Sequence, residues 1–185
     1  TLSSSSAASD VYKRQLLKRG AKLALSSRRI DRLEAIAQSA DPNHSLVVPV
    51  DVMDPSSIAH AYQTIKAQWG SIDLLLFVSG IYIPLRADDF NMEDAQKTVD
   101  SNILGPMGAV ATVLPDMLQV GHGHLAIVGS VAGYSGLPKA LAYGPTKAAM
   151  INFCETLFYD LQPKGIGVHM ISPGFVATEA TAKND

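Results

Sequence analysis

The sequence predicts an α/β fold in which a parallel sheet carries helices on both faces. Short apolar stretches alternate with stretches whose apolar residues recur every three or four positions, as in successive βαβ units. Residues 73–78 are almost all apolar, which is typical of a strand buried on both faces. The chain has 185 residues, 47% of them hydrophobic, enough for one domain with a substantial core.

The beginning of the chain does not follow this pattern. Residues 1–15 are rich in Ser and Ala and then charged, and they lack the apolar segment of a secretory signal. We expect residues 1–15 to be a non-native or disordered leader, and residues 16–185 to form the domain.

The first elements of the domain follow from stop signals and from apolar spacing. Residues 16–19 are expected to end a helix, because Gly20 suits the position after a helix C-terminus. Residues 22–26 then form a short strand. The next helix is marked by apolar residues on one face, namely Ile30, Leu33, Ile36 and Ala37.

A second strand is expected over residues 46–52. Asp54 then caps a helix with Pro55 in its first turn, and Gly70 ends that helix. The later elements are expected over residues 73–78, 92–118, 125–128, 142–161 and 167–171.

Composition argues against several classes of partner. The net charge is −2 and the pI is near 6.2, and no stripe of Lys and Arg is present, so nucleic acid is not expected as a partner. The longest apolar stretch, residues 74–85, is interrupted and shorter than the about 20 residues that span a bilayer. One cysteine, Cys154, and scattered histidines favour neither a disulfide nor a metal site, and we expect a cytoplasmic protein.

The most informative pattern combines a tyrosine, a lysine and a serine. Tyr143 and Lys147 are four residues apart and therefore share one face of a helix. Ser130 precedes Tyr143 by thirteen residues, at the end of an apolar strand. An adjacent ammonium group favours a phenolate, so we expect the pKa of Tyr143 to lie below its usual value of about 10. Such a group can exchange protons near neutral pH.

Asn102 lies within the helical region 92–118, four residues before Pro106. Proline has no N–H, so the backbone carbonyl of Asn102 loses its usual helical donor. A water molecule is one expected partner for this carbonyl. A simple kink without function is an equal alternative.

With Asn102, Ser130, Tyr143 and Lys147 in this order, the chain resembles the short-chain dehydrogenase/reductase family from Leu16 onward. The resemblance implies a Rossmann-like, doubly wound sheet and a catalytic role for all four residues. Tyr143 would be the general acid/base, and Ser130 would hold the substrate oxygen. Lys147 would lower the pKa of Tyr143 and bind the nicotinamide ribose, and Asn102 would anchor a water. Taken singly, each residue also has a purely structural interpretation.

The resemblance also implies a nicotinamide cofactor. The residues implied to contact it are Asp51, Val52, Gly80, Tyr143, Lys147, Pro173, Gly174, Val176 and Thr178. Asp51 would contact the adenine edge, Val52 would pack on the adenine ring, and Thr178 would contact the carboxamide.

The choice between NAD(H) and NADP(H) depends on Ser27 and Arg28, which follow the first strand at the position where NAD-binding proteins usually have an acid. A guanidinium suits a 2′-phosphate, so NADP(H) is expected and NAD(H) is less favoured. Alternatively, Arg28 or Arg29 is an ordinary solvated charge.

Three features depart from the family pattern. The glycine-rich phosphate turn should fall at residues 4–9, which read Ser-Ser-Ser-Ala-Ala-Ser, and the strand before it is missing. Residues 78–80 read Val-Ser-Gly where the family usually has Asn-Ala-Gly, and the chain stops before the lid helix and last strand. We therefore expect a partial NAD(P)-binding Rossmann domain with a gap in its sheet, and weak cofactor binding.

The expected function is NADP(H)-dependent interconversion of a ketone and a secondary alcohol. Apolar residues that follow Ser130 suggest a partly apolar substrate: Val131, Tyr134, Leu137 and Pro138. The alternatives are a non-catalytic nucleotide-binding or scaffold module or an inactive fragment on the same fold, and a sugar-nucleotide epimerase of the extended type. By analogy with the family, helices 92–118 and 142–161 are expected to form a dimer interface.

Overall fold

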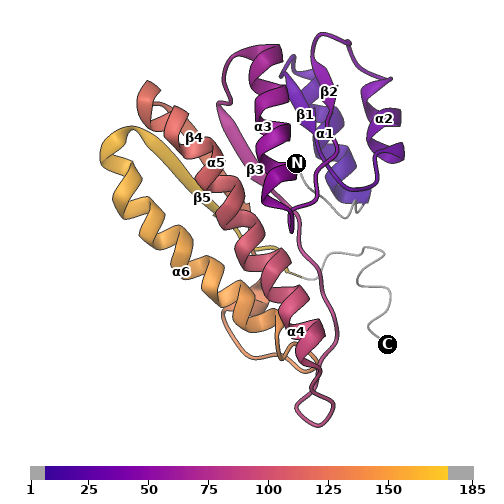
Figure 1. Ribbon diagram of the computed structural model, residues 1–185, viewed down its shortest axis with the longest axis vertical. Coiled ribbons are helices and arrows are strands. Elements are labelled where there is room, and N and C mark those ends of the chain that lie inside the picture. The colour runs from indigo at the N-terminus through magenta and orange to yellow at the C-terminus, as the bar shows by residue number, and fades with distance from the viewer. Residues whose placement is uncertain (1–6, 175–185) are drawn as a thin grey trace.

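The computed structural model describes residues 7–174 of the chain (Figure 1). The elements, in chain order, are α1 (Ala7–Lys18), β1 (Leu23–Leu25), α2 (Asp31–Ala37), β2 (Ser45–Val47), α3 (Pro55–Trp69), β3 (Leu74–Phe77), α4 (Met92–Val99), the π-helical segment η1 (Asp100–Leu104), α5 (Gly105–Val120), β4 (Gly123–Val128), the 3₁₀ turn η2 (Val131–Gly133), α6 (Tyr143–Leu161), the 3₁₀ turn η3 (Gln162–Lys164) and β5 (Ile166–Ile171). Strands and helices alternate as the sequence predicts.

All the strand pairs are parallel, as predicted, but they form two sheets. One sheet pairs β1 with β2, and the other has the order β3-β4-β5. Within residues 7–174, no ladder joins β1 to β3. This separation agrees with the gap that is expected between these two neighbours when a central strand is absent.

The second strand is shorter than the predicted range 46–52, because β2 ends at Val47. Single hydrogen bonds nevertheless continue the pairing beyond it. The Val48 N–H donates to the Leu25 carbonyl at 3.0 Å, and the Val50 N–H donates to the Ser27 carbonyl at 3.2 Å. The two chain segments therefore stay together up to the positions where we expect cofactor contacts.

Helices α5 and α6 lie side by side in front of β4 and β5 (Figure 1). Their apolar faces and that of α3 cover the β3-β4-β5 sheet and enclose the main core, to which Phe77, Leu125 and Ile127 contribute nearly inaccessible side chains. A second, smaller core of Leu25, Leu33 and Ile36 lies between the β1-β2 pair and its helices.

The structure places residues 7–15, which belong to the predicted non-native or disordered leader 1–15, in a helix. They form most of α1, which contains neither Gly nor Pro before its end and thus has no residue that would stop the helix earlier. Leu17 packs against the smaller core. The Arg14 guanidinium donates to the Ser39 hydroxyl at 2.8 Å, which ties α1 to the end of α2.

The helical region predicted over 92–118 runs from Met92 to Val120 and is interrupted by η1. This region is long and apolar enough to span a membrane. The core helices of soluble proteins often have the same length and composition. In this fold the region packs against α3 and α6, and its residues Ala109, Val110 and Val113 are buried.

Candidate active site

Tyr143 and Lys147 lie on one face at the beginning of α6, as predicted. Tyr143 is the first residue of the helix, and the Lys147 ammonium lies over its ring, 5.5 Å from the ring centroid. Lys147 is only 5% exposed, because its side chain points into the protein. Its Nζ donates a hydrogen bond to the Val128 carbonyl at 3.3 Å. The first turn of α6 is thereby joined to the carboxyl end of β4.

Ser130 follows β4 and faces the same place. Its hydroxyl accepts a hydrogen bond from the Ala132 N–H at 3.2 Å and lies near enough to the Tyr143 hydroxyl to lower the pKa of that phenol. The turn that follows is pressed against α6, because a Cβ on Gly133 would lie 2.8 Å from the backbone of Lys147. A larger residue at position 133 would have to displace this turn or the first turns of α6. The structure therefore brings Ser130, Tyr143 and Lys147 together.

The expected low pKa of Tyr143 is wrong for this structure. Burial raises the pKa of Tyr143 above its usual value of 10.0; the hydrogen bond from Ser130 lowers it in part, and the adjacent Tyr82 raises it further. Removal of water from the buried phenol is the largest cause of this rise in pKa. At neutral pH, Tyr143 is therefore a protonated phenol, ready to donate a proton.

Lys147 titrates much closer to neutrality than an ordinary lysine. Burial lowers its pKa from 10.5 to about 8. Among residues 7–174, no carboxylate is paired with it, and its ammonium donates a hydrogen bond to the Val128 carbonyl. At neutral pH Lys147 is still mostly an ammonium, and burial of this charge has a free-energy cost to the folded state.

We expect this cost to appear as a pH dependence of stability. Between pH 8 and 10.5 the unfolded chain keeps the Lys147 proton that the folded chain has lost, so folding becomes more favourable as pH rises through this window. The gain amounts to roughly 3 kcal/mol, from 2.5 pKa units at about 1.4 kcal/mol each. Urea unfolding of wild type and of Lys147→Met, measured across this range, checks it. Equal pH dependence in the two proteins would contradict the assignment.

Asn102 lies in the π-helical segment η1, where the Gly105 N–H donates to the Asp100 carbonyl five residues earlier. Pro106 comes directly after this segment. Because proline has no N–H, it cannot donate to the Asn102 carbonyl, and the wider π-helical turn lies at the point where this hydrogen bond is missing. The Asn102 side chain is 1% exposed and points inward. Its Oδ1 accepts from the Ile81 N–H at 2.8 Å, and its Nδ2 donates to the Ile81 carbonyl at 2.9 Å and to Thr146 Oγ1 at 3.3 Å.

Gly80 makes room for these side chains. A Cβ at Gly80 would lie 3.2 Å from Asn102 Oδ1 and 3.3 Å from Lys147 Nζ. Any side chain there would crowd both polar groups. The segment after β3 thus meets Asn102 and Lys147 in one place.

Two contributors to this site were not among the predicted residues. The ring of Tyr82 meets the ring of Tyr143 edge to face, with centroids 5.2 Å apart, and its hydroxyl donates to the Lys139 carbonyl at 3.5 Å. Thr146 accepts from Asn102 and donates to the Tyr143 carbonyl at 2.7 Å. A signal for Tyr82 exists, since it follows a strand at the carboxyl edge of the sheet, where ligands of open α/β sheets bind.

The predicted adenine-side residues form a second group at the ends of β1 and β2. The hydroxyl of Ser27 donates to the Arg29 carbonyl, and Arg28 is exposed. Asp51 Oδ1 accepts from the Met53 N–H at 3.0 Å. Val52 is 9% exposed and packs closely against the start of α5. A Cβ added to Gly105 would lie 3.1 Å from the Cβ of Val52.

The predicted nicotinamide-side residues are placed only in part. The Pro173 carbonyl accepts from the Val131 N–H at 3.2 Å, so the end of β5 lies beside the turn after Ser130. Gly174 has open space where a side chain would be. Val176 and Thr178 lie outside the described residues.

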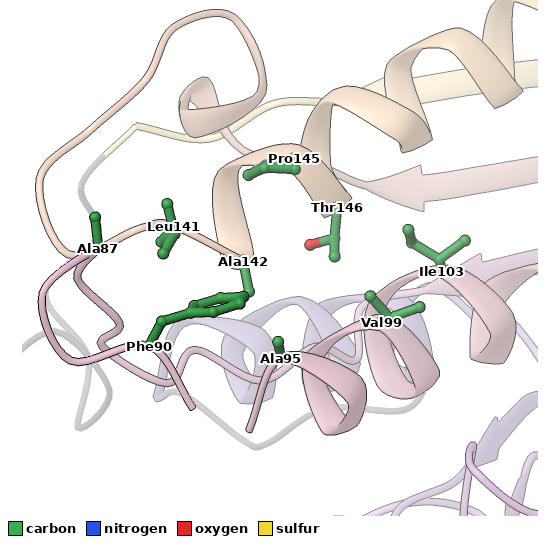
Figure 2. Close-up of a pocket in the computed structure, with 9 residues that line it drawn as sticks. All are labelled: Ala87, Phe90, Ala95, Val99, Ile103, Leu141, Ala142, Pro145 and Thr146. Carbon is green, nitrogen blue, oxygen red and sulfur yellow. The ribbon is translucent and has the colours of Figure 1, made fainter. Parts of the chain in front are cut away.

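A separate apolar groove of about 530 Å³ lies between α4 and the start of α6 (Figure 2). Val99 and Ile103 from one side and Thr146 from the other point into it. Neither Ser130 nor Tyr143 lines it.

Comparisons with known proteins agree with this fold and site. The family model for short chain dehydrogenase matches residues 11–185. An uncharacterized oxidoreductase from Myxococcus xanthus is 33% identical over 172 residues, which are 92% of this chain and 68% of the relative. The chain therefore belongs to the short-chain dehydrogenase family, whose named relatives are oxidoreductases.

Solved structures show the same architecture. A short-chain dehydrogenase from Streptomyces avermitilis superposes with a TM-score of 0.90 at 22% identity, over 97% of this chain and 66% of that chain. The closed form of serine dehydrogenase complexed with NADP⁺ superposes with a TM-score of 0.88 at 27% identity, over 95% and 71%. The Rossmann-like prediction is confirmed, and this chain spans about two thirds of these structures.

Proposed function

We propose that the protein is an NADP(H)-dependent oxidoreductase that interconverts a ketone and a secondary alcohol. The observation that carries the proposal is the meeting of the Ser130 and Tyr143 hydroxyls, with the Lys147 ammonium over the tyrosine ring. Two hydroxyl donors at one point suit a carbonyl oxygen that gains negative charge. The scaffold alternative does not require this arrangement.

The cofactor would supply the hydride. Ser130 would hold the substrate oxygen, and Tyr143, protonated at neutral pH, would transfer its proton to that oxygen during ketone reduction. The phenolate left behind would be stabilised by the Lys147 ammonium, which remains mostly charged below its pKa of about 8. Asn102 would hold the segment around Gly80 in place and, through its backbone carbonyl, a water that connects the site to solvent.

The residues present fit a nicotinamide dinucleotide at several points. Gly80 leaves the backbone uncovered beside Lys147, and Gly174 faces open space at the end of β5. The Arg28 guanidinium is exposed next to Ser27, where a 2′-phosphate would lie. The cofactor would therefore stretch from β1 across the strand ends to Tyr143.

For this chain we expect weak cofactor binding with a preference for NADPH over NADH. Replacing Arg28 with Ala should reduce the preference by about tenfold, because a charge-assisted hydrogen bond to phosphate is lost. Saturation-transfer NMR, which detects weak complexes, measures both ligands. Lys22→Ala, an exposed cation at the other end of β1, is the matched control. Equal binding of NADH and NADPH by wild type would contradict the NADP(H) assignment.

The catalytic proposal is tested by reduction of a panel of partly apolar ketones with NADPH, followed by the loss of reduced nicotinamide absorbance. Tyr143→Phe provides the paired protein without the proton donor. Turnover that is absent from the variant and present in wild type supports the proposal. NADPH binding without turnover of any ketone would favour the alternative of a scaffold module or an inactive fragment.

We also propose a homo-oligomer. The family resemblance implies a dimer interface on the helices over 92–118 and 142–161. Large apolar residues are exposed along η1, α5 and α6: Leu104, Leu118, Val120, Phe158 and Tyr159. A second copy would cover this surface. A cytoplasmic location remains a prediction from composition.

A further inference from the structure

Two histidines face each other on the side of the β3-β4-β5 sheet that α5 and α6 leave uncovered. His124 lies on β4 and His169 on β5, and both are exposed. Their neighbours Leu125 and Ile127 point the other way into the main core, as alternation along a strand requires. Nδ1 of His124 and Nε2 of His169 are 3.1 Å apart.

The strand register creates this pair. His124 is opposite Gly167 and Ala126 is opposite His169, so the two histidines are diagonal neighbours on one face. The two diagonal side chains reach each other across this parallel pair, and their ring centroids are 5.2 Å apart. The glycine is essential, because a Cβ at Gly167 would lie 2.3 Å from His124 Nδ1 and 3.1 Å from His169 Nε2. Both rings lean over the space that the missing side chain leaves.

We propose that His124 Nδ1 and His169 Nε2 chelate a late divalent transition-metal ion, Cu²⁺ most tightly. With metal–nitrogen bonds of about 2.05 Å, a separation of 3.1 Å corresponds to an N–metal–N angle of about 100°. This value lies between square-planar and tetrahedral geometry and suits Cu²⁺, Ni²⁺ and Zn²⁺. In a neutral imidazole one nitrogen is free to bind, so both rings can offer the facing atoms at once.

The rest of the coordination sphere would be water. Among residues 7–174, no group of three or more His, Cys, Asp or Glu side chains is placed to hold a metal ion. His122 is close, with its ring centroid 6.1 Å from that of His124, but its Nε2 is directed to Asp73 at 3.8 Å. Two imidazoles and exposed surroundings favour a moderate affinity that follows the Irving–Williams order.

A bound ion would link β4 to β5 at a distance from the catalytic hydroxyls. Ser130 is six residues beyond His124 along the chain, about 20 Å at the rise of an extended strand. The ion would therefore stabilise the strand pair without touching the proposed active site. The inference stands whether or not the proposed ketone reduction is correct.

The test is titration of the purified chain with CuCl₂ and NiCl₂, followed by calorimetry and by electron paramagnetic resonance for Cu²⁺. Wild type should bind one ion with two coordinated imidazole nitrogens. His124→Gln and His169→Gln should each bind the ion at least about tenfold more weakly. In wild type the second imidazole is already held beside the ion, and each variant loses this additional ligand. His122→Gln, an exposed neighbour outside the pair, is the matched control and should bind like wild type.

A thermal measurement gives an independent reading. NiCl₂ should raise the melting temperature of wild type and of His122→Gln, and should leave that of either single variant of the pair unchanged. Gly167→Ala, which places a methyl group against His124, should also weaken binding. Equal affinity in wild type and the single variants, or a loss as large in His122→Gln, would overturn the inference.

Discussion

Tyr143→Phe is expected to reduce NADPH-dependent ketone reduction by at least about a hundredfold, the contribution typical of a positioned general acid. Phenylalanine keeps the ring and therefore its edge-to-face contact with Tyr82 and its place beneath the Lys147 ammonium. What it removes is the hydroxyl that meets Ser130. Folding and the weak binding of NADPH should not change.

Tyr159→Phe is the control for this experiment, because Tyr159 lies on the same helix, is 75% exposed and takes no part in the proposed chemistry. Its turnover should match wild type. If Tyr143→Phe retained most of the activity, the proton would have to come from another group. The proposed role of the tyrosine would then be wrong even though the family assignment holds.

Asn102→Ala should be the most destabilising single substitution among the site residues. It removes three hydrogen bonds and leaves the partly buried N–H and carbonyl of Ile81 without their Asn102 partners. Unsatisfied buried groups cost about 1–3 kcal/mol each, so we expect a loss of roughly 3–5 kcal/mol in the free energy of unfolding. Urea denaturation followed by circular dichroism measures this loss.

Asn91→Ala provides a comparison in which an asparagine also bonds two backbone groups. Asn91 caps α4 by accepting from the Glu93 N–H at 2.9 Å and the Asp94 N–H at 3.2 Å, but it is exposed. Water can replace its side chain, and removal of such a cap costs about 1 kcal/mol. A loss for Asn102→Ala no larger than for Asn91→Ala would show that the Asn102 contacts are not important for stability.

Local signals in the sequence located most of the elements. Asp54 caps α3 by accepting from the Ser56 N–H, and Gly70 ends this helix with φ of 83°. Gly20 after α1 has φ of 81°. These assignments succeed because a cap, or a glycine with positive φ, acts within one helical turn. Strand ends were placed less well, since β2 ends five residues before the predicted end at Val52 and its limit depends on pairing with β1.

The start of α1 was missed for a related reason. Residues 7–15 have a composition that permits either disorder or helix, and the contact of Leu17 with the smaller core and of Arg14 with Ser39 favours the helix. These contacts join residues that are distant in sequence. A short stretch of sequence therefore does not reveal these contacts.

The sequence by itself determined the parallel α/β class, the sharing of one helix face by Tyr143 and Lys147, and the family that these residues indicate. Spacing of four residues acts through the fixed geometry of a helix, which needs no tertiary information. Only the tertiary structure decided that Tyr82 meets Tyr143, that burial raises the pKa of the phenol, and that His124 and His169 meet over Gly167. Each of these depends on which strands pair, in which register, and on how much water the packed helices exclude.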